Sequence, residues 1–275
     1  MSLRRTAVAG TWYPAVPARL TAEIAQYSDA AAADTSIPAD ADVVAVIAPH
    51  AGLMYSGPVA AYSYRHLLGQ TYDTIVLVGP SHYVPFEGAS IWARGAFATP
   101  LGNLPIDEET AAAIMAACPL VHELAVAHER EHSLEMQLPF LAALARGARI
   151  VPIVMGYQTR TTAYSLGDCL APAVHSRRAL LVASSDLSHF HDARMAAALD
   201  RQVIEQVDRF DADGLMDLLE DRPDHACGGG PMVAVMRAAR ALGATHARVL
   251  HYADSGDVSG DKSSVVGYLA AVLWR

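Results

Sequence analysis

The chain alternates between short, nearly continuous apolar runs and longer segments whose apolar positions recur every three or four residues. The short runs are rich in Val, Ile and Leu, which predicts buried strands. Because polar residues do not alternate with apolar ones along them, they are typical of a sheet that is covered on both faces. The predicted strands cover residues 42–50, 73–82, 149–156, 179–189, 247–256 and 264–273.

Helices are predicted between these strands. A proline opens the segment 58–68, as is common in the first turn of a helix. Acidic residues stand in the first turn of the segment 106–118, where the helix dipole favours them. Pro139 should kink the segment 131–145 or move its start. The predicted helices cover residues 18–28, 58–68, 106–118, 131–145, 193–210 and 230–243, and a shorter helix followed by a loop covers 211–224.

The alternation of strands and helices predicts an α/β fold, a three-layer α/β sandwich with a largely parallel central sheet. Neither a Ser/Gly-rich linker nor a low-complexity tract interrupts the sequence. We therefore expect a single domain over residues 1–275.

Three of the predicted strands end in histidine. His50 and His82 follow directly on two of them, and a third strand ends in SSDLSH, which delivers Asp186 and His189. In open α/β sheets, ligands bind beyond the carboxyl ends of the strands. One such histidine could simply hydrogen-bond a loop, but histidines at three separate strand ends favour a functional site.

A second cluster of candidates lies in HEREHSLEMQ, residues 128–137. Its first five residues read H-E-x-x-H, the pattern of zinc proteases with Glu129 as the base. We disfavour that interpretation because no third ligand has metzincin spacing. We expect instead that His132 and Glu135, three residues apart on one helix face, line the pocket of the strand-end histidines. The alternative is a solvated helix face.

Cys227 stands in ACGGGP, where three readings compete. A phosphate-binding loop is disfavoured because no Lys-Ser/Thr follows the glycines and Pro231 lacks a backbone N–H. Near a helix N-terminus the thiol could act as a nucleophile. It could also join two histidines as a metal ligand. The plainest alternative is a small buried residue at a tight turn.

Composition and charge exclude some classes of function. The 275 residues carry a net charge of −9 and no basic run longer than a pair, which disfavours extended nucleic-acid or anionic-membrane binding. Only three cysteines occur, which favours a reducing compartment over a disulfide scaffold. We find no signal peptide and no apolar run long enough to cross a bilayer, so we expect a cytoplasmic protein.

The ordered motifs resemble those of the MEMO family, whose bacterial and archaeal members are often labelled AmmeMemoRadiSam system protein B. The resemblance spans residues 9–231 and implies a fold like that of LigB-type class III extradiol dioxygenases. The label also implies a functional association with radical SAM and AMMECR-type proteins. The motifs are AGTWYP, APHAGLMYSG, GPSHY, PLGNLPID, EHSLEMQLPFL, IVPIVMG, SSDLSH and ACGGGP.

The resemblance also implies roles for individual residues. His50, His82 and Cys227 correspond to metal ligands, and His189 corresponds to an acid/base histidine oriented by Asp186 or a neighbour. In the dioxygenase relatives, two histidines and a glutamate hold non-haem iron. Replacement of the carboxylate by Cys227 therefore puts dioxygenase activity in doubt. It implies one transition metal ion, with copper or iron favoured and zinc as the alternative.

We expect a metal-dependent redox enzyme, an oxidoreductase related to the extradiol dioxygenases, that acts on a small-molecule substrate. Trp12 and Tyr55 would be walls of its pocket. The human family member is regarded as a copper- or iron-binding redox protein that binds a phosphotyrosine-bearing receptor peptide. One alternative is thus a non-catalytic module that binds an anionic or phosphorylated ligand or peptide through protonated histidines. Another is a metal-free Cys–His hydrolase.

Overall fold

The computed structural model describes residues 2–145 and 147–275 and is built on a nine-stranded sheet. Four parallel strands form the centre of this sheet. Their order across the sheet is β2 (Val43–Ala48), β9 (Ala179–Ser184), β3 (Thr74–Pro80) and β8 (Arg149–Met155). The predicted parallel sheet is confirmed for these four strands. Their carboxyl ends therefore lie along one edge.

Antiparallel strands flank this centre. The last two predicted strands are joined by a short connection, too short for the crossover that a parallel pair requires, so they form an antiparallel pair next to β2. On the other side, a short strand pairs antiparallel with β8, and a two-residue strand that pairs parallel with this short strand forms the edge of the sheet. The flanking strands are β12 (Val265–Trp274), β11 (His246–Asp254), β10 (His189–His191), β4 (Ala89–Ile91) and β7 (Val121–His122).

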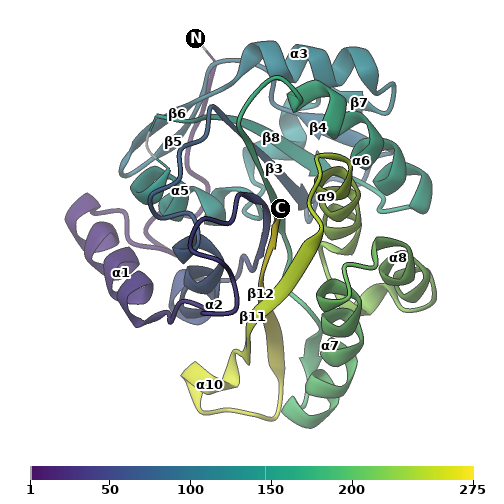
Figure 1. The fold of residues 1–275 in the computed structure, drawn as a ribbon. Coiled ribbons are helices and arrows are strands. Elements are labelled where there is room, and N and C mark those ends of the chain that lie inside the picture. Colours follow the sequence, from purple (N-terminus) through teal and green to yellow (C-terminus); the bar gives the residue numbers. More distant parts are fainter. Residues whose placement is uncertain (1, 146) are drawn as a thin grey trace.

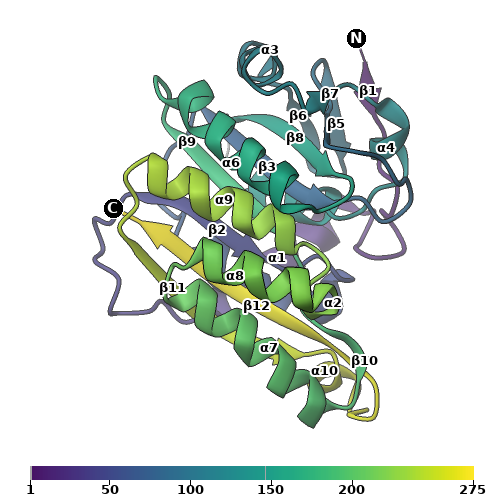
Figure 2. The same cartoon turned by 90° about the vertical axis from the view of Figure 1, so that its right-hand side faces the viewer.

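Alternate residues of the central strands face two separate cores. Val76 and Val78 of β3 belong to one apolar cluster, and Ile75 and Leu77 belong to the other. This division explains the continuous apolar runs, because both faces of each strand are buried. Figure 2 looks onto the face that α6 (Arg160–Val174), α7 (Ala193–Asp208), α8 (Ala212–Asp221) and α9 (Gly229–Ala241) cover. The opposite face carries α1 (Pro17–Ala30), α2 (Leu53–Arg65) and α5 (Leu138–Leu144) (Figure 1). The predicted three-layer sandwich is confirmed.

Smaller elements complete the fold. A separate three-stranded sheet joins β1 (Leu3–Arg4) to β5 (Ala96–Thr99) and β6 (Gly102–Pro105). The remaining helices are α3 (Glu108–Ala117), α4 (Ala125–Glu129) and α10 (Gly256–Ser259). Within the described ranges, every helix is too short or too polar to cross a bilayer.

The longest helix that was not predicted from the sequence is α6. Helix α6 contains Gly167 and Pro172, which are poor helix formers, and so its pattern did not stand out. A side chain at Gly167 would lie 2.8 Å from the carbonyl oxygen of Ala234, so the glycine allows α6 to pack closely on α9. Tertiary packing thus outweighs the low intrinsic propensity.

Two predicted helix boundaries were wrong. Helix α2 begins at Leu53, and Pro58 lies inside it rather than at its start. The segment 131–145 is a loop, a 3₁₀ turn over Glu135–Gln137 and then α5. Helix α5 begins at Leu138, and Pro139 lies in its first turn, where a missing backbone N–H costs no helical hydrogen bond.

Candidate functional site

The candidate site lies at the carboxyl edge of the parallel strands. His50 follows β2, Asp186 follows β9 and His82 follows β3, and β9 pairs with both of the other two strands. Residues that are far apart in the sequence are thereby delivered to one place, as expected for an α/β sheet.

Three histidines of this edge form a group that could hold a metal ion. Among the residues that the structure describes, one ligand atom from each of His50, His82 and His132 lies within 4.8 Å of the other two. The rings of His82 and His132 are stacked with centroids 4.4 Å apart, and the His50 ring stands edge-on to both, at 5.2 and 5.6 Å. His132, expected as a wall of the pocket, lies within the group itself.

The hydrogen bonds of Ser184 determine the tautomer of His50. The Ser184 hydroxyl donates its single proton to the Ser133 carbonyl oxygen at 2.7 Å and accepts from Gln137 Nε2 at 2.7 Å. Its 2.9 Å contact with His50 Nδ1 therefore requires Nδ1–H as the donor. Burial lowers the pKa of His50 well below its ordinary value, so the ring is neutral and Nε2 carries a free lone pair.

Glu131 determines the tautomer of His82. Its Oε1 lies 2.8 Å from His82 Nδ1, and its carboxylate accepts the backbone N–H groups of His82, His132 and Ser133 at 2.6, 3.0 and 2.9 Å. Burial alone would raise the pKa of Glu131, but the hydrogen bonds and charge of His82 outweigh it and lower the pKa to about 2. The ionised carboxylate thus holds the His82 Nδ1–H and leaves Nε2 free.

His132 is enclosed by aromatic groups. The Trp12 ring packs on it with centroids 4.3 Å apart, and the Tyr83 hydroxyl lies 3.2 Å from its Nδ1. Burial and the neighbouring His50 and His82 lower its pKa to about 4. Trp12, expected as a wall of the pocket, therefore lies beside the group of histidines.

Cys227 adjoins the group through His50. Its Sγ lies 3.2 Å from His50 Nε2 and accepts the backbone N–H of Asp186 at 3.3 Å. Burial, and then the charge of Asp186, raise the pKa of the Cys227 thiol well above its ordinary value. The thiol is thus protonated near neutral pH and can donate to His50 Nε2.

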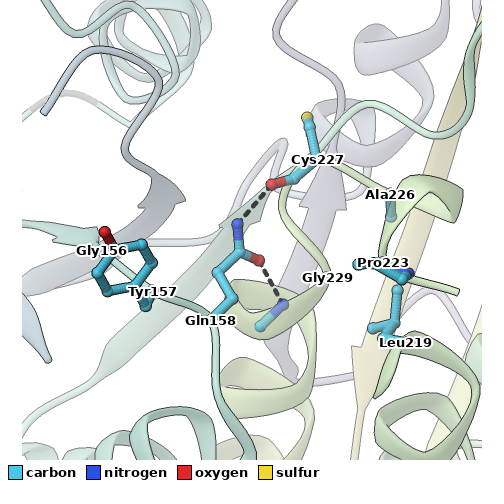
Figure 3. A pocket seen from close by; sticks show the side chains of 9 residues that line it. Gly156, Tyr157, Gln158, Leu219, Pro223, Ala226, Cys227 and Gly229 are labelled. Atoms are coloured by element: carbon cyan, nitrogen blue, oxygen red, sulfur yellow. Dashed lines mark hydrogen bonds between the residues drawn. The ribbon is translucent and has the colours of Figure 1, made fainter. Parts of the chain in front are cut away.

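The glycines after Cys227 permit close approach to neighbouring backbone. A side chain at Gly228 would lie 2.3 Å from the Ser184 carbonyl oxygen. The Gln158 amide stabilises the turn through two hydrogen bonds. It donates to the Cys227 carbonyl oxygen at 2.7 Å and accepts from the Gly230 N–H at 2.8 Å (Figure 3). Figure 3 also shows the Cys227 sulfur pointing away from Gln158, and the pocket beside this turn has a volume of about 260 Å³.

We predict that Gly228→Ala lowers the free energy of unfolding by about 1–3 kcal/mol, because the added methyl group must push two backbone segments apart. Urea denaturation measures the effect. Gly52→Ala is the matched control, because its nearest atom to an added Cβ would be 3.7 Å away. Equal stability of the two variants would show that the turn has spare room.

Asp186 and His189, expected as catalytic residues, both lie at this edge. Asp186 Oδ1 accepts the backbone N–H of His50 at 2.6 Å, and burial raises the pKa of its carboxyl group. His189 Nδ1 donates to the Leu187 carbonyl oxygen at 2.8 Å, which leaves Nε2 as its free nitrogen. His189 is therefore oriented by a backbone carbonyl rather than by Asp186.

Two expected pocket residues have other partners. Glu135 is fully buried and its carboxylate pairs with Arg4 while accepting from Tyr13 Oη at 2.7 Å and from two backbone N–H groups. It anchors the N-terminal segment that carries Trp12, because the 3₁₀ turn directs it there rather than along a helix face with His132. Tyr55 packs on a small apolar cluster around Tyr268.

The structure also excludes the zinc-protease reading of HEREH. Helix α4 ends at Glu129, so His128 and His132 do not share a helix face. The His128 ring instead contacts Ser90 Oγ at 3.1 Å and packs against Trp92. Glu129 is exposed.

Sequence reasoning missed the residues that orient the histidine rings: Glu131, Ser184, Gln137 and Tyr83. All four lie within the quoted motifs: Glu131 and Gln137 in EHSLEMQLPFL, Ser184 in SSDLSH and Tyr83 in GPSHY. Their hydrogen-bond partners lie in distant parts of the chain, and single-sequence periodicity does not reveal such contacts.

Comparisons with known proteins identify the fold and the family of the chain. A structure of an uncharacterized protein from Escherichia coli K12 superposes with a TM-score of 0.52, covering 85% of this chain and 100% of that one at 15% identity, which supports the fold alone. The MEMO1 family protein of Methanothermobacter thermautotrophicus is 39% identical over 272 residues, 97% of this chain and 98% of its own. That of Methanosarcina mazei is 39% identical over 276 residues, 99% of this chain and 100% of its own. The model of the Memo-like protein family matches residues 4–272. The chain therefore belongs to the Memo-like protein family.

Proposed function

We propose that the chain is a metal-dependent redox enzyme that acts on a small-molecule substrate at the carboxyl edge of its sheet. His50 and His82 are the central ligands, and His132 and Cys227, which both adjoin His50, complete the donor set. The observation that carries the proposal is that Ser184 and Glu131 occupy the Nδ1 atoms of His50 and His82, which leaves the lone pair of each ring on Nε2. The Cys227 thiol contacts His50 Nε2 at 3.2 Å and would give up its proton when it binds a metal beside that nitrogen.

The chemistry of the donors fits a transition metal. Metal ligation requires unprotonated imidazoles, and the lowered pKa values of His50 and His132 supply them at neutral pH. A carboxylate partner on the other ring nitrogen, such as Glu131 on His82, is a usual support of metal-binding histidines. Imidazoles with one thiolate suit copper, and iron or zinc are alternatives. When bound, the metal would supply a redox centre beside the substrate.

The surrounding residues would bind the substrate and move protons. His189 is held by the Leu187 carbonyl oxygen, so its Nε2 is the atom that would take or give a proton. The aromatic faces of Trp12 and Tyr83 border His132 and would exclude water from one side of the substrate. Asp186 holds the His50 backbone in position.

Two alternatives are less well supported. An anion-binding pocket needs protonated histidines, but burial lowers the pKa of His50 and that of His132, the latter to about 4. A metal-free hydrolase needs a Cys227 thiolate, and the 3.2 Å contact with His50 provides a base. Burial, however, raises the pKa of that thiol, which disfavours the nucleophilic form.

Elemental analysis of anaerobically purified protein tests the proposal. We expect about one equivalent of a transition metal in the wild type and loss of most of it in His82→Ala. Cys227→Ala and His132→Ala should each lower the metal content, because both residues belong to the donor set. A wild type without metal, which also takes up neither copper, iron nor zinc on titration, would refute the proposal.

A further inference from the structure

Two of the three cysteines, distant in the sequence, meet where α3 packs on α6. Cys118 caps the C-terminus of α3, and Cys169 lies within α6. Cys118 Sγ lies 3.8 Å from the Ser165 carbonyl oxygen, and Cys169 Sγ lies 3.4 Å from the Ala117 carbonyl oxygen. Ser165 is one helical turn before Cys169, and Ala117 is the residue next to Cys118. Each sulfur therefore contacts the backbone beside the other.

The two thiols differ in accessibility. Cys118 is fully buried in the apolar core, and Cys169 is partly exposed and packs against that core. Burial first, and then the hydrogen bond and charge of the Cys118 thiol, raise the pKa of Cys169 to about 12. The influence of Cys118 on this pKa is a second sign that the thiols adjoin.

The geometry points to a dithiol–disulfide site formed by Cys118 and Cys169, which a small-molecule disulfide such as oxidised glutathione converts to a cross-link between α3 and α6. The site is separate from the proposed metal site, since neither cysteine is a member of the histidine group or contacts Cys227.

The reaction proceeds by two exchanges. The more exposed Cys169 loses its proton to solvent and attacks one sulfur of glutathione disulfide, which breaks the S–S bond and releases one glutathione thiolate. The Cys118 thiolate then attacks Cys169 Sγ and displaces the second glutathione. The protein loses two electrons and two protons, and one glutathione disulfide is reduced to two thiols.

The rate of this oxidation should depend steeply on pH. Because the thiolate is the nucleophile, a raised thiol pKa makes the reaction slow near neutral pH. We expect the rate to rise about tenfold per pH unit between about pH 7.5 and 9.5, as the thiolate fraction grows.

Peptide mapping of the full chain without reductant tests the site. The reduced protein is incubated with oxidised glutathione over this pH range, and we expect a peptide pair linked through Cys118 and Cys169. Cross-linking should raise Tm by about 5–10 °C, because a long loop is closed in the unfolded chain. The peptide mapping and the Tm measurement are repeated with Cys227→Ser, a variant that lacks the third thiol and should still form the cross-link.

Single variants give the matched controls. In Cys118→Ser we expect a stable glutathione adduct on Cys169, and in Cys169→Ser an unmodified Cys118. Glutathione that stays on Cys169 in the wild type while Cys118 remains a free thiol would overturn the inference. So would the persistence of both free thiols at the highest pH.

Discussion

Replacing Arg4 by Met should lower the free energy of unfolding by about 3–5 kcal/mol, the usual cost of removing one partner of a buried ion pair. Arg4 and Glu135 pair with side chains only 1% and 0% exposed. Arg4 also donates through Nε to the His128 carbonyl oxygen at 3.1 Å. Without Arg4, Glu135 keeps a buried charge with only neutral donors. Urea denaturation followed by circular dichroism measures the loss.

Arg5→Met is the matched control, because Arg5 is the exposed neighbour and its replacement should change stability by less than about 0.5 kcal/mol. Arg4→Met combined with Glu135→Gln should lose less than the sum of the single losses, since the double variant leaves no unpaired charge. Additive losses would show that the two residues do not stabilise each other.

Replacing Glu131 by Gln should weaken metal binding by about 10–100-fold, the typical effect of removing a partner that orients a ligating histidine. The Glu131 carboxylate accepts four N–H groups, from the His82 ring and from three backbone positions. An amide has a single acceptor oxygen with two lone pairs, and its NH₂ group would face other donors. The His82 ring then loses the acceptor that keeps its Nε2 free. Titration against a chelator of known affinity measures the change.

Glu129→Gln is the control for this variant. Glu129 lies two residues earlier and is exposed, so the same loss of charge there should leave the dissociation constant unchanged. If both variants bind metal with equal affinity, Glu131 does not orient a ligand. If Glu131→Gln retains full affinity for copper but loses it for iron or zinc, His82 is not a copper ligand, and the proposed set of four donors is wrong for copper.

The strands and most helices follow from local pattern. The apolar runs of β2, β3, β8 and β9 predict buried strands because each has both faces in a core. Helix α7 was predicted from its apolar spacing, and its start is marked by Asp192, whose side chain accepts two backbone N–H groups. Helix α6 was not predicted because it contains Gly and Pro, and its Gly167 is explained only by the close packing of α9.

For the candidate site, strand ends were predictable and side-chain directions were not. His50, His82 and Asp186 follow strands whose carboxyl ends share an edge, so their meeting was expected from the order of elements. His132 and Glu135 were expected to act together, but a loop and a 3₁₀ turn replace the assumed helix. One residue therefore joins the histidines while the other is buried against Arg4.

The sequence by itself determined which residues become strands, the layered α/β class and the delivery of histidines to one edge of the sheet. These properties depend on residues close together in the chain and on the parallel order of strands. Only the tertiary structure decided which ring nitrogens are free and which cysteines meet. Those outcomes depend on hydrogen bonds between distant segments, such as His50 with Ser184 and Cys169 with the end of α3. A contact of that kind is set by how whole layers pack, and no local pattern encodes it.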